Sequence, residues 1–349
     1  MAKFLLLGYY GYGNAGDEAV LLAIAQSLAQ EGHKLGVLTA SGETTEKLLS
    51  ALPVRTFPRM SPGGVLPGLL WSDALVLGGG SLLQDVTGPL SLRYYIAIMR
   101  LAKLFNKPSV FFAQGLGPFI RKGSLEKVGR VAKDAKLLSV RDLKSWELLV
   151  ELGVRPEAVH LSADPVWSLP LEKIAVEPPV EGPYLLFALR SWQGTESKLV
   201  EALQKVRSQT ELPFVYVAMH PEFDLPLAKT LAAEVGGQVV EPLDLPTLLG
   251  YFANAQIVCA MRLHALIFAA ILGKSAVAIS YDPKVDALVE ELGIEGLNLV
   301  GDLEESLALA LLRASFTAEQ KKKVSALTKR AETGLELLAS LGRELDGKN

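Results

Sequence analysis

Five basic side chains that could bind an anionic substrate each stand at the end of a short apolar run. Arg141 lies in "LLSVRD", Arg190 in "LLFALR", Arg262 and His264 in "AMRLHALIF", and Lys284 in "SYDPKV". Guanidinium and ammonium groups bind carboxylates and phosphates, and an imidazole can give or take a proton near neutral pH. We interpret the set as a site for a small anion that carries a carboxylate and a phosphate group. For any one of these residues alone, a surface salt bridge is the alternative.

A glycine-rich segment near the start of the chain has the spacing of a dinucleotide-binding loop but not its surroundings. Gly11, Gly13 and Gly16 fit the pattern G-x-G-x-x-G. A dinucleotide also needs a helix start that accepts a pyrophosphate and an acidic residue that ends the second strand. Here Asp17 and Glu18 stand at the helix start, and the second apolar run ends "VLTASGE", with no acid where the ribose needs it. The sequence therefore predicts a loop that faces a sugar.

Two further glycine-rich segments, "LGGGSLLQD" and "QGLGPF", follow later apolar runs. Three such loops at one edge of a sheet predict a floor for a large polar ligand, because glycine lets the backbone approach it closely; tight turns are the alternative. Asp17 is also a candidate general base toward a sugar hydroxyl, with a helix N-cap as the alternative. We expect this sugar to be the acceptor of a reaction. The residues that we expect to bind it are Gly13, Asn14, Asp17, Gly79, Gly80, Gln84, Arg190 and His220.

Other motifs are less informative. We expect His33 on the surface and His160 in a structural role at a strand end, whereas His220 ends the run "PFVYVAMH" at the functional edge. No spacing typical of a metal site, a nucleophile elbow or a nucleoside triphosphate loop occurs. We therefore expect neither a metal nor another cofactor.

Composition narrows the class of protein. The 349 residues are 50% hydrophobic with a formal net charge of −3, which disfavours nucleic acid as a partner. Cys259 is the only cysteine, so no internal disulfide forms, and we expect a cytoplasmic protein with Cys259 in a buried strand. The segment "SPGGVLPGLLW" (61–71) predicts a loop with exposed apolar side chains. A packed connection is the simpler interpretation, and contact with a lipid-linked substrate or a membrane surface is the alternative.

Strand-like and helix-like segments alternate along the chain, which predicts an α/β fold with two doubly wound parallel sheets. We expect strands near 3–9, 34–40, 74–80, 109–115, 136–142, 184–190, 213–219, 237–241, 255–261 and 275–280. We expect two Rossmann-like domains that face each other across a cleft, with the ligand at the strands' carboxyl ends. The predicted boundaries are 1–168, a proline-rich linker at 169–183, 184–315, and a C-terminal helix at 316–349 that packs back on the first domain.

Taken together, "GYYGYGNAGDEA", "GGGSLLQD", "QGLGP", "SVRD", "MRLHALIFAA" and "YDPKV" resemble the polysaccharide pyruvyl transferase family, most closely its CsaB type. The resemblance implies a GT-B-like fold, phosphoenolpyruvate as the donor and an N-acetylmannosamine residue as the acceptor. It implies a 4,6-linked pyruvate ketal on a lipid-linked or nucleotide-linked cell-wall precursor, which anchors surface-layer proteins. It also implies that Arg141, His264 and Lys284 hold the donor.

The cationic set fits this chemistry. His264 would protonate C3 of the enol, Arg141 and Lys284, with Arg262, would bind carboxylate and phosphate, and Asp17 would take the acceptor proton. Two other functions stay open at this point: a nucleotide-sugar glycosyltransferase of GT-B type, and a non-catalytic sugar-binding or nucleotide-binding regulator.

Overall fold

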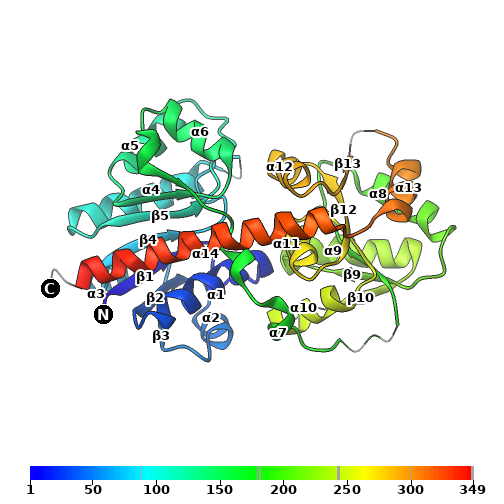
Figure 1. The fold of residues 1–349 in the computed structure, drawn as a ribbon, viewed down its shortest axis with the longest axis horizontal. Coiled ribbons are helices and arrows are strands. Elements are labelled where there is room, and N and C mark those ends of the chain that lie inside the picture. Colours follow the sequence, from blue (N-terminus) through cyan, green and yellow to red (C-terminus); the bar gives the residue numbers. More distant parts are fainter. Residues whose placement is uncertain (87, 179, 181, 242–243, 300, 347–349) are drawn as a thin grey trace. The chain divides into compact units, whose positions relative to one another are not determined.

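A computed structural model describes residues 1–86, 88–178, 180, 182–241, 244–299 and 301–346 (Figure 1). The chain divides into two compact units. The first comprises Met1–Tyr12, Asp17–Leu169 and the chain from Leu327 on, and the second comprises Gly13–Gly16 and Pro170–Ala326. Parts of two predicted segments, residues 179 and 181 of the linker and residues 347–349 of the tail, lie outside the described residues.

The first unit contains a seven-stranded parallel sheet in the order β3-β2-β1-β4-β5-β6-β7. Its strands are β1 (Lys3–Leu7), β2 (Lys34–Thr39), β3 (Val54–Pro58), β4 (Ala74–Gly78), β5 (Ser109–Gln114), β6 (Leu137–Val140) and β7 (Val159–Leu161). Its helices are α1 (Ala15–Gln30), α2 (Gly42–Leu48), α3 (Pro62–Trp71), α4 (Pro89–Leu104), α5 (Ser124–Lys133) and α6 (Leu143–Glu151), with short 3-10 turns at Pro156–Ala158 and Pro165–Ser168. The five strands expected here are present. The edge strand β3 was not expected, and the other edge strand, β7, was indicated only by the expected strand end at His160.

Helix α3 corrects the prediction of a loop over 61–71. Ser61 caps the helix by accepting a hydrogen bond from the Gly63 amide, and Pro62 occupies the first turn, where its missing N–H costs nothing. A side chain at Gly64 would collide with the Pro58 carbonyl at 2.0 Å. The glycines therefore allow this short helix to pack directly on the backbone of β3, so the segment is a packed helix and not an open loop. The predicted exposure of an apolar side chain holds for Leu70, which is 62% exposed.

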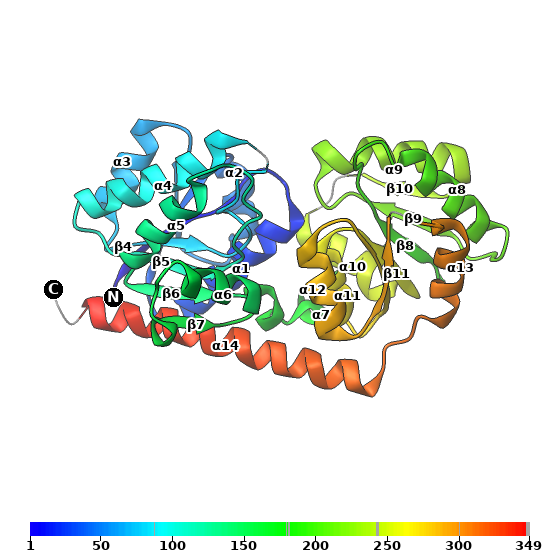
Figure 2. The same cartoon turned by 90° about the horizontal axis from the view of Figure 1, so that it is seen from above.

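The second unit contains a six-stranded parallel sheet in the order β10-β9-β8-β11-β12-β13 (Figure 2). Its strands are β8 (Leu185–Ala188), β9 (Phe214–Val217), β10 (Gln238–Val240), β11 (Ile257–Ala260), β12 (Ser275–Ser280) and β13 (Glu295–Asn298). Its helices are α7 (Leu171–Ile174), α8 (Glu196–Arg207), α9 (Pro221–Val235), α10 (Leu245–Asn254), α11 (Leu263–Ile271), α12 (Pro283–Leu292) and α13 (Leu303–Arg313). Cys259 is buried in β11 as predicted, whereas β13 was not expected.

The last helix, α14 (Ala318–Asp346), passes from the second unit into the first at Leu327. In the first unit the Arg330 Nε donates to the Ser162 carbonyl at 2.9 Å, and Gly342 lies against the His33 ring. His33 is therefore buried, with 6% of its surface exposed, and the prediction of a surface histidine was wrong.

No helix in the described part of the chain is both long enough and apolar enough to cross a bilayer.

Candidate functional site

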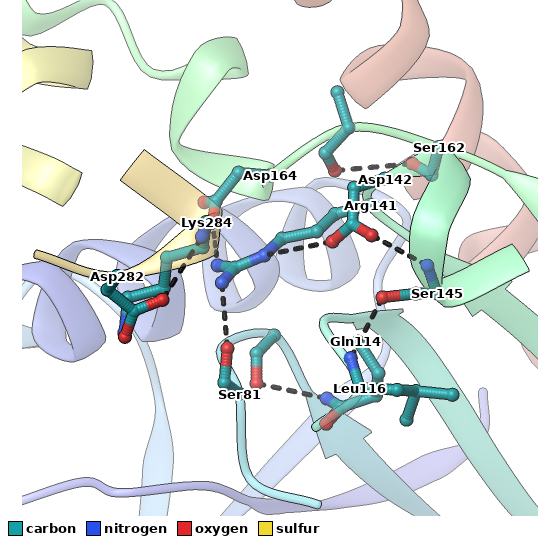
Figure 3. A network of polar contacts seen from close by, with 12 residues as sticks. Ser81, Gln114, Leu116, Arg141, Asp142, Ser145, Ser162, Asp164, Asp282 and Lys284 are labelled. Carbon is teal, nitrogen blue, oxygen red and sulfur yellow. Dashed lines mark hydrogen bonds and ion pairs between the residues drawn. The ribbon is translucent and has the colours of Figure 1, made fainter. Parts of the chain in front are cut away.

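Arg141 directly follows β6 at the carboxyl edge of the first sheet, as predicted. Its guanidinium is almost fully buried: Nη1 donates to Asp164 Oδ2 at 2.7 Å, and Nη2 donates to Ser81 Oγ at 2.9 Å (Figure 3). Asp142 caps α6 by accepting from the Ser145 amide, with one oxygen 3.9 Å from Arg141 Nε. These groups hold the guanidinium in one orientation.

Glycine at position 115 makes room for this guanidinium. A Cβ on Gly115 would lie 2.9 Å from Arg141 Nε and 3.0 Å from Ser81 Oγ, closer than real Cβ contacts. The loop "QGLGPF" therefore brings its backbone against Arg141.

Gln114 fixes the second glycine loop. Its Nε2 donates to the carbonyls of Leu77 (3.1 Å), Gly79 (2.9 Å) and Phe112 (3.3 Å), although the side chain is fully buried. The pairing of β5 with β6 shifts register between Phe111 and Gln114, so the strand is irregular at the end that carries Gln114.

Gly79 and Gly80 both have positive φ, at +64° and +76°, which only glycine adopts easily. A Cβ on Gly79 would lie 2.3 Å from a Val20 methyl of α1, and one on Gly80 would lie 3.2 Å from Asp17 Oδ1. Within the first unit the loop after β4 thus lies against the first turns of α1. Gln84, farther along the same loop, accepts a hydrogen bond from the Val86 amide at 2.8 Å.

The start of α1 explains why the G-x-G-x-x-G pattern need not bind a pyrophosphate. The Glu18 carboxylate accepts a hydrogen bond from the Gly11 amide at 2.9 Å, so a protein carboxylate already uses a loop N–H. The helix begins at Ala15, and Asn14 Oδ1 accepts from the Gly16 amide at 3.2 Å. Asp17 therefore lies inside the first turn and is not the N-cap that was the alternative for it.

Sequence reasoning missed a buried arginine, Arg59, which follows β3 and is 4% exposed. Its guanidinium donates to the Gly8 carbonyl and to the Tyr95 hydroxyl at 3.1 Å. Four tyrosine rings surround it with centroids 5.0 to 5.9 Å away, namely Tyr9, Tyr12, Tyr94 and Tyr95. Such cation–π contacts stabilise a desolvated guanidinium, and Arg59 joins the loop after β1 to α4. The "GYYGY" tyrosines were the signal in the sequence.

In the second unit, Arg262 and His264 follow β11, but Arg262 is already paired. Its Nε donates to Asp224 Oδ2 at 3.0 Å, and its Nη2 donates to Oδ1 of the same fully buried carboxylate. The Asp224 carboxylate also accepts from the His220 amide at the start of α9. This pairing leaves Arg262 fewer donors for a substrate anion, and it joins the first turn of α9 to the residue that follows β11.

His264 lies in the first turn of α11 and packs on the first glycine loop. A Cβ on Gly16 would lie 2.1 Å from His264 Nδ1, so the imidazole rests directly on the Gly16 backbone. The same short segment is held to the loop after β9, because the Ala15 amide donates to the Met219 carbonyl at 2.8 Å. Gly13 has a φ of +73°, and a Cβ on it would lie 4.0 Å from Pro221 Cδ.

Lys284 stands in the first turn of α12, after β12, which is the neighbour of β11 in the sheet. Its amide donates to Asp282 Oδ1 at 3.0 Å, and its Nζ lies 3.4 Å from Asp282 Oδ2 (Figure 3). The Lys284 side chain remains 37% exposed and is therefore accessible to a ligand. A helix start adds the partial positive charge of its amides to this cation.

Arg190, after β8, belongs to an aromatic cluster. Its guanidinium lies 5.5 Å from the Trp192 ring and 5.3 Å from the Tyr281 ring, and Nη1 donates to the Tyr281 hydroxyl at 3.2 Å. His220 is buried, and burial together with the nearby Arg262 charge lowers the pKa of its imidazole.

The predicted residues thus fall into two groups, each at the carboxyl edge of its own sheet. The first unit carries Asp17, Gly79, Gly80, Gln84 and Arg141, and the second carries Gly13, Asn14, Arg190, His220, Arg262, His264 and Lys284. Among the described residues, no group of three or more histidines, cysteines or carboxylates is placed to hold a metal ion.

Comparison with known proteins gives a family and a fold. The model of the polysaccharide pyruvyl transferase family matches residues 14–283 of this chain. No curated protein is similar to the chain at a significant level.

Among solved structures, the chain is similar to HepE of Anabaena in complex with UDP and glucose, at 12% identity and a TM-score of 0.64 over 98% of this chain and 99% of that one. It is also similar to the UDP-GlcNAc 2-epimerase of Methanocaldococcus jannaschii, at 15% identity and a TM-score of 0.68 over 97% of this chain and 100% of that one. The UDP-GlcNAc 2-epimerase of Neisseria meningitidis, bound to UDP-GlcNAc, is similar at 12% identity and a TM-score of 0.66. This similarity covers 97% of this chain and 100% of that one. These likenesses confirm an α/β fold with two Rossmann-like domains, of the GT-B-like kind.

Proposed function

The chain belongs to the polysaccharide pyruvyl transferase family, and from that premise we propose a specific reaction. It transfers the pyruvyl group of phosphoenolpyruvate to an N-acetylmannosamine residue of a lipid-linked or nucleotide-linked cell-wall precursor, as in the CsaB type. The product is a 4,6-ketal, and inorganic phosphate is released. We place this reaction in the cytoplasm, on a precursor of a surface-layer anchor, without a cofactor.

The observation that carries the proposal is the cationic edge of the second sheet. His264 and Lys284 follow β11 and β12, which are adjacent strands, and Lys284 keeps an accessible ammonium at a helix start. A dianionic phosphate and a carboxylate require such a site. The anchored guanidinium of Arg141 at the carboxyl edge of the first sheet supports a second anion contact.

The chemistry follows from the donor. His264 gives a proton to C3 of the enol phosphate, which makes C2 electrophilic, and an acceptor hydroxyl adds to C2. The C2–O bond to phosphate then breaks, Lys284 and Arg141 stabilise the charge that develops on the leaving group, and the second hydroxyl adds to C2 and closes the ring. Of the two protons lost by the hydroxyls, one replaces the proton that His264 gave and the other leaves on phosphate. Asp17 is our candidate for the group that first receives the acceptor proton.

Replacement of His264 tests the proposed acid. We expect His264→Asn to lower kcat by about 10²–10⁴-fold, because general acid catalysis contributes about that much. The assay follows phosphate release and the mass gain of an N-acetylmannosaminyl acceptor. His160→Asn, at an exposed position of β7, is the matched control and should keep full activity. Normal ketal formation by a folded His264→Asn protein would overturn the assignment.

A GT-B glycosyltransferase is the second candidate, because the similar solved structures include proteins in complex with UDP and UDP-GlcNAc. The two functions differ in the donor. Release of UDP from a UDP-sugar, without phosphoenolpyruvate, would favour the glycosyltransferase. Phosphate release that depends on the acceptor, with a pyruvyl mass gain of that acceptor, would establish the pyruvyl transferase.

A further inference from the structure

The layer of the first unit formed by α3, α4 and α5, with the loops that precede them, exposes an unusual set of large apolar side chains. These are Met60 (71% exposed), Leu70 (62%), Val86 (44%), Leu90 (74%), Leu104 (75%) and Ile120 (66%). Apolar side chains in such a group mark a contact surface, whereas single ones need no explanation. We call this layer the α3–α4–α5 face.

The α3–α4–α5 face is continuous. Helix α3 packs on β3, β2 and β1, and α4 packs on β5 and on α5, so the three helices cover neighbouring strands. Their inner side chains, such as Leu69, Met99 and Val131, share one core cluster on the same side of the sheet. The loops before α4 and α5 are joined as well, because the Asp85 carboxylate accepts from the amides of Ile120 (2.7 Å) and Arg121 (3.0 Å).

The same face is strongly cationic, although the whole chain has a net charge of −3. Across α3, α4 and α5 there are six basic residues and one acidic residue, Glu126. Along the exposed side of α4, apolar and basic residues share one stripe at helical spacing: Leu90, Arg93, Ala97, Arg100 and Leu104. Exposed Arg121 and Lys122 add two further cations beside Ile120.

A pocket of about 320 Å³ opens between the end of α4 and α5. Arg100, Lys103 and Lys107 line it together with the apolar side chain of Met99. One carboxylate is present, Asp134, which pairs with Lys103 at 2.7 Å, and Lys107 Nζ donates to a backbone carbonyl at 2.5 Å. The pocket therefore has an excess of positive charge above an apolar wall, which suits a lipid phosphate.

From these observations we propose that the α3–α4–α5 face binds the surface of an anionic phospholipid bilayer. Apolar side chains would enter the headgroup boundary while the flanking arginines and lysines contact lipid phosphates, as in other interfacial helices. The charge also argues against a second copy of this chain as the occupant, because a two-fold contact would set two cationic faces against each other.

The position of the face has a consequence for the substrate. Met60, Val86 and Ile120 follow β3, β4 and β5, so they lie at the carboxyl edge of the first sheet, the edge that carries Arg141. A bilayer on this face would bring that edge to the level of the headgroups. The acceptor would then be lipid-linked rather than nucleotide-linked. This step rests on the proposed function, whereas the membrane surface itself does not.

The test is co-sedimentation of the full chain with vesicles, without phosphoenolpyruvate or acceptor. We expect binding to vesicles that contain phosphatidylglycerol, weaker binding at high salt, and little binding to phosphatidylcholine alone. The double substitution Arg93→Glu with Arg100→Glu should weaken binding at least about 25-fold, since each basic residue near an anionic surface contributes about fivefold. Leu90→Ser with Leu104→Ser should also weaken it.

The matched control is Lys321→Glu with Lys322→Glu, the same charge change at exposed positions of α14 in the second unit, which should bind like the unaltered protein. Equal binding by the Arg93 and Arg100 variant, or no binding to anionic vesicles, would overturn the proposal. So would a dimer that forms without vesicles and is lost in that variant. Phosphate release with a water-soluble acceptor is measured separately, so that a failed membrane assay and a failed reaction are told apart.

Discussion

At the scale of single residues, both groups of candidate residues depend on close backbone contacts that only glycine allows. Gly115 lies against the Arg141 guanidinium, and Gly16 lies against the His264 ring. The Arg141 guanidinium and the His264 imidazole can occupy these positions because the neighbouring residue is a glycine and has no side chain.

Gly115→Ala tests this idea. The new methyl would lie 2.9 Å from Arg141 Nε and 3.0 Å from Ser81 Oγ, so the guanidinium must move. We expect kcat/KM for phosphoenolpyruvate to fall about 10²-fold, the effect of a misplacement of about 1 Å. Gly63→Ala, at an exposed position of α3 whose nearest neighbour is 3.4 Å away, is the control and should keep full activity. Unchanged kinetics for Gly115→Ala would mean that Arg141 does not hold the donor.

Residues at strand ends could be predicted because the parallel strands of a sheet end at one edge of that sheet. Arg141 lies at this edge of the first sheet, and His264 and Lys284 lie at this edge of the second. What could not be predicted is which partner each one has. The carboxylate that binds Arg262 is 38 residues away in the sequence, and the rings around Arg59 come from separate elements. Such pairings depend on tertiary packing, which local pattern does not encode.

At the scale of elements, tertiary packing outweighs the low helix propensity of the residues in α3. Helix α3 contains Pro67 and three glycines, yet it is a helix because its small residues approach β3 closely. The edge strands β3 and β13 were missed for a related reason. Each carries polar or charged residues where the central strands are apolar, namely Arg55 and Thr56 in β3, and Glu295 and Asn298 in β13.

Helix α14 makes a second close approach, at Gly334. A Cβ there would lie 2.1 Å from Ser162 Oγ and 3.1 Å from Ser162 Cβ. We expect Gly334→Ala to destabilise the protein by about 1–2 kcal/mol, because overpacking outweighs the gain in helix propensity of about 1 kcal/mol. Urea unfolding would measure this, with Gly301→Ala, which has no described atom within 4 Å, as the control. A more stable Gly334→Ala protein would show that α14 can shift freely on the sheet.

At the scale of the whole molecule, the first unit is completed by the end of the chain. Leu327, Leu335 and Leu338 of α14 are buried, and Gly334 lies 3.8 Å from Phe112 of β5 when given a Cβ. Residues 1–169 alone therefore leave part of one face of this sheet uncovered.

Expression of fragments tests this dependence. We expect residues 1–169 alone to be insoluble or to lack a cooperative thermal transition, because a large apolar surface would be exposed. The same fragment joined through a flexible linker to residues 327–346 should be soluble and melt cooperatively by circular dichroism. Stable folding of residues 1–169 without the helix would show that α14 is dispensable for the first unit.

The path of the chain also determines how this protein can be recombined with its relatives. It crosses between the units near residues 12, 16, 169 and 326. A chimera made at a single junction would join parts of two parents inside one core. A sound exchange of the first unit must carry residues 1–12, 17–169 and 327–346 from one parent, and leave residues 13–16 with the parent that supplies His264.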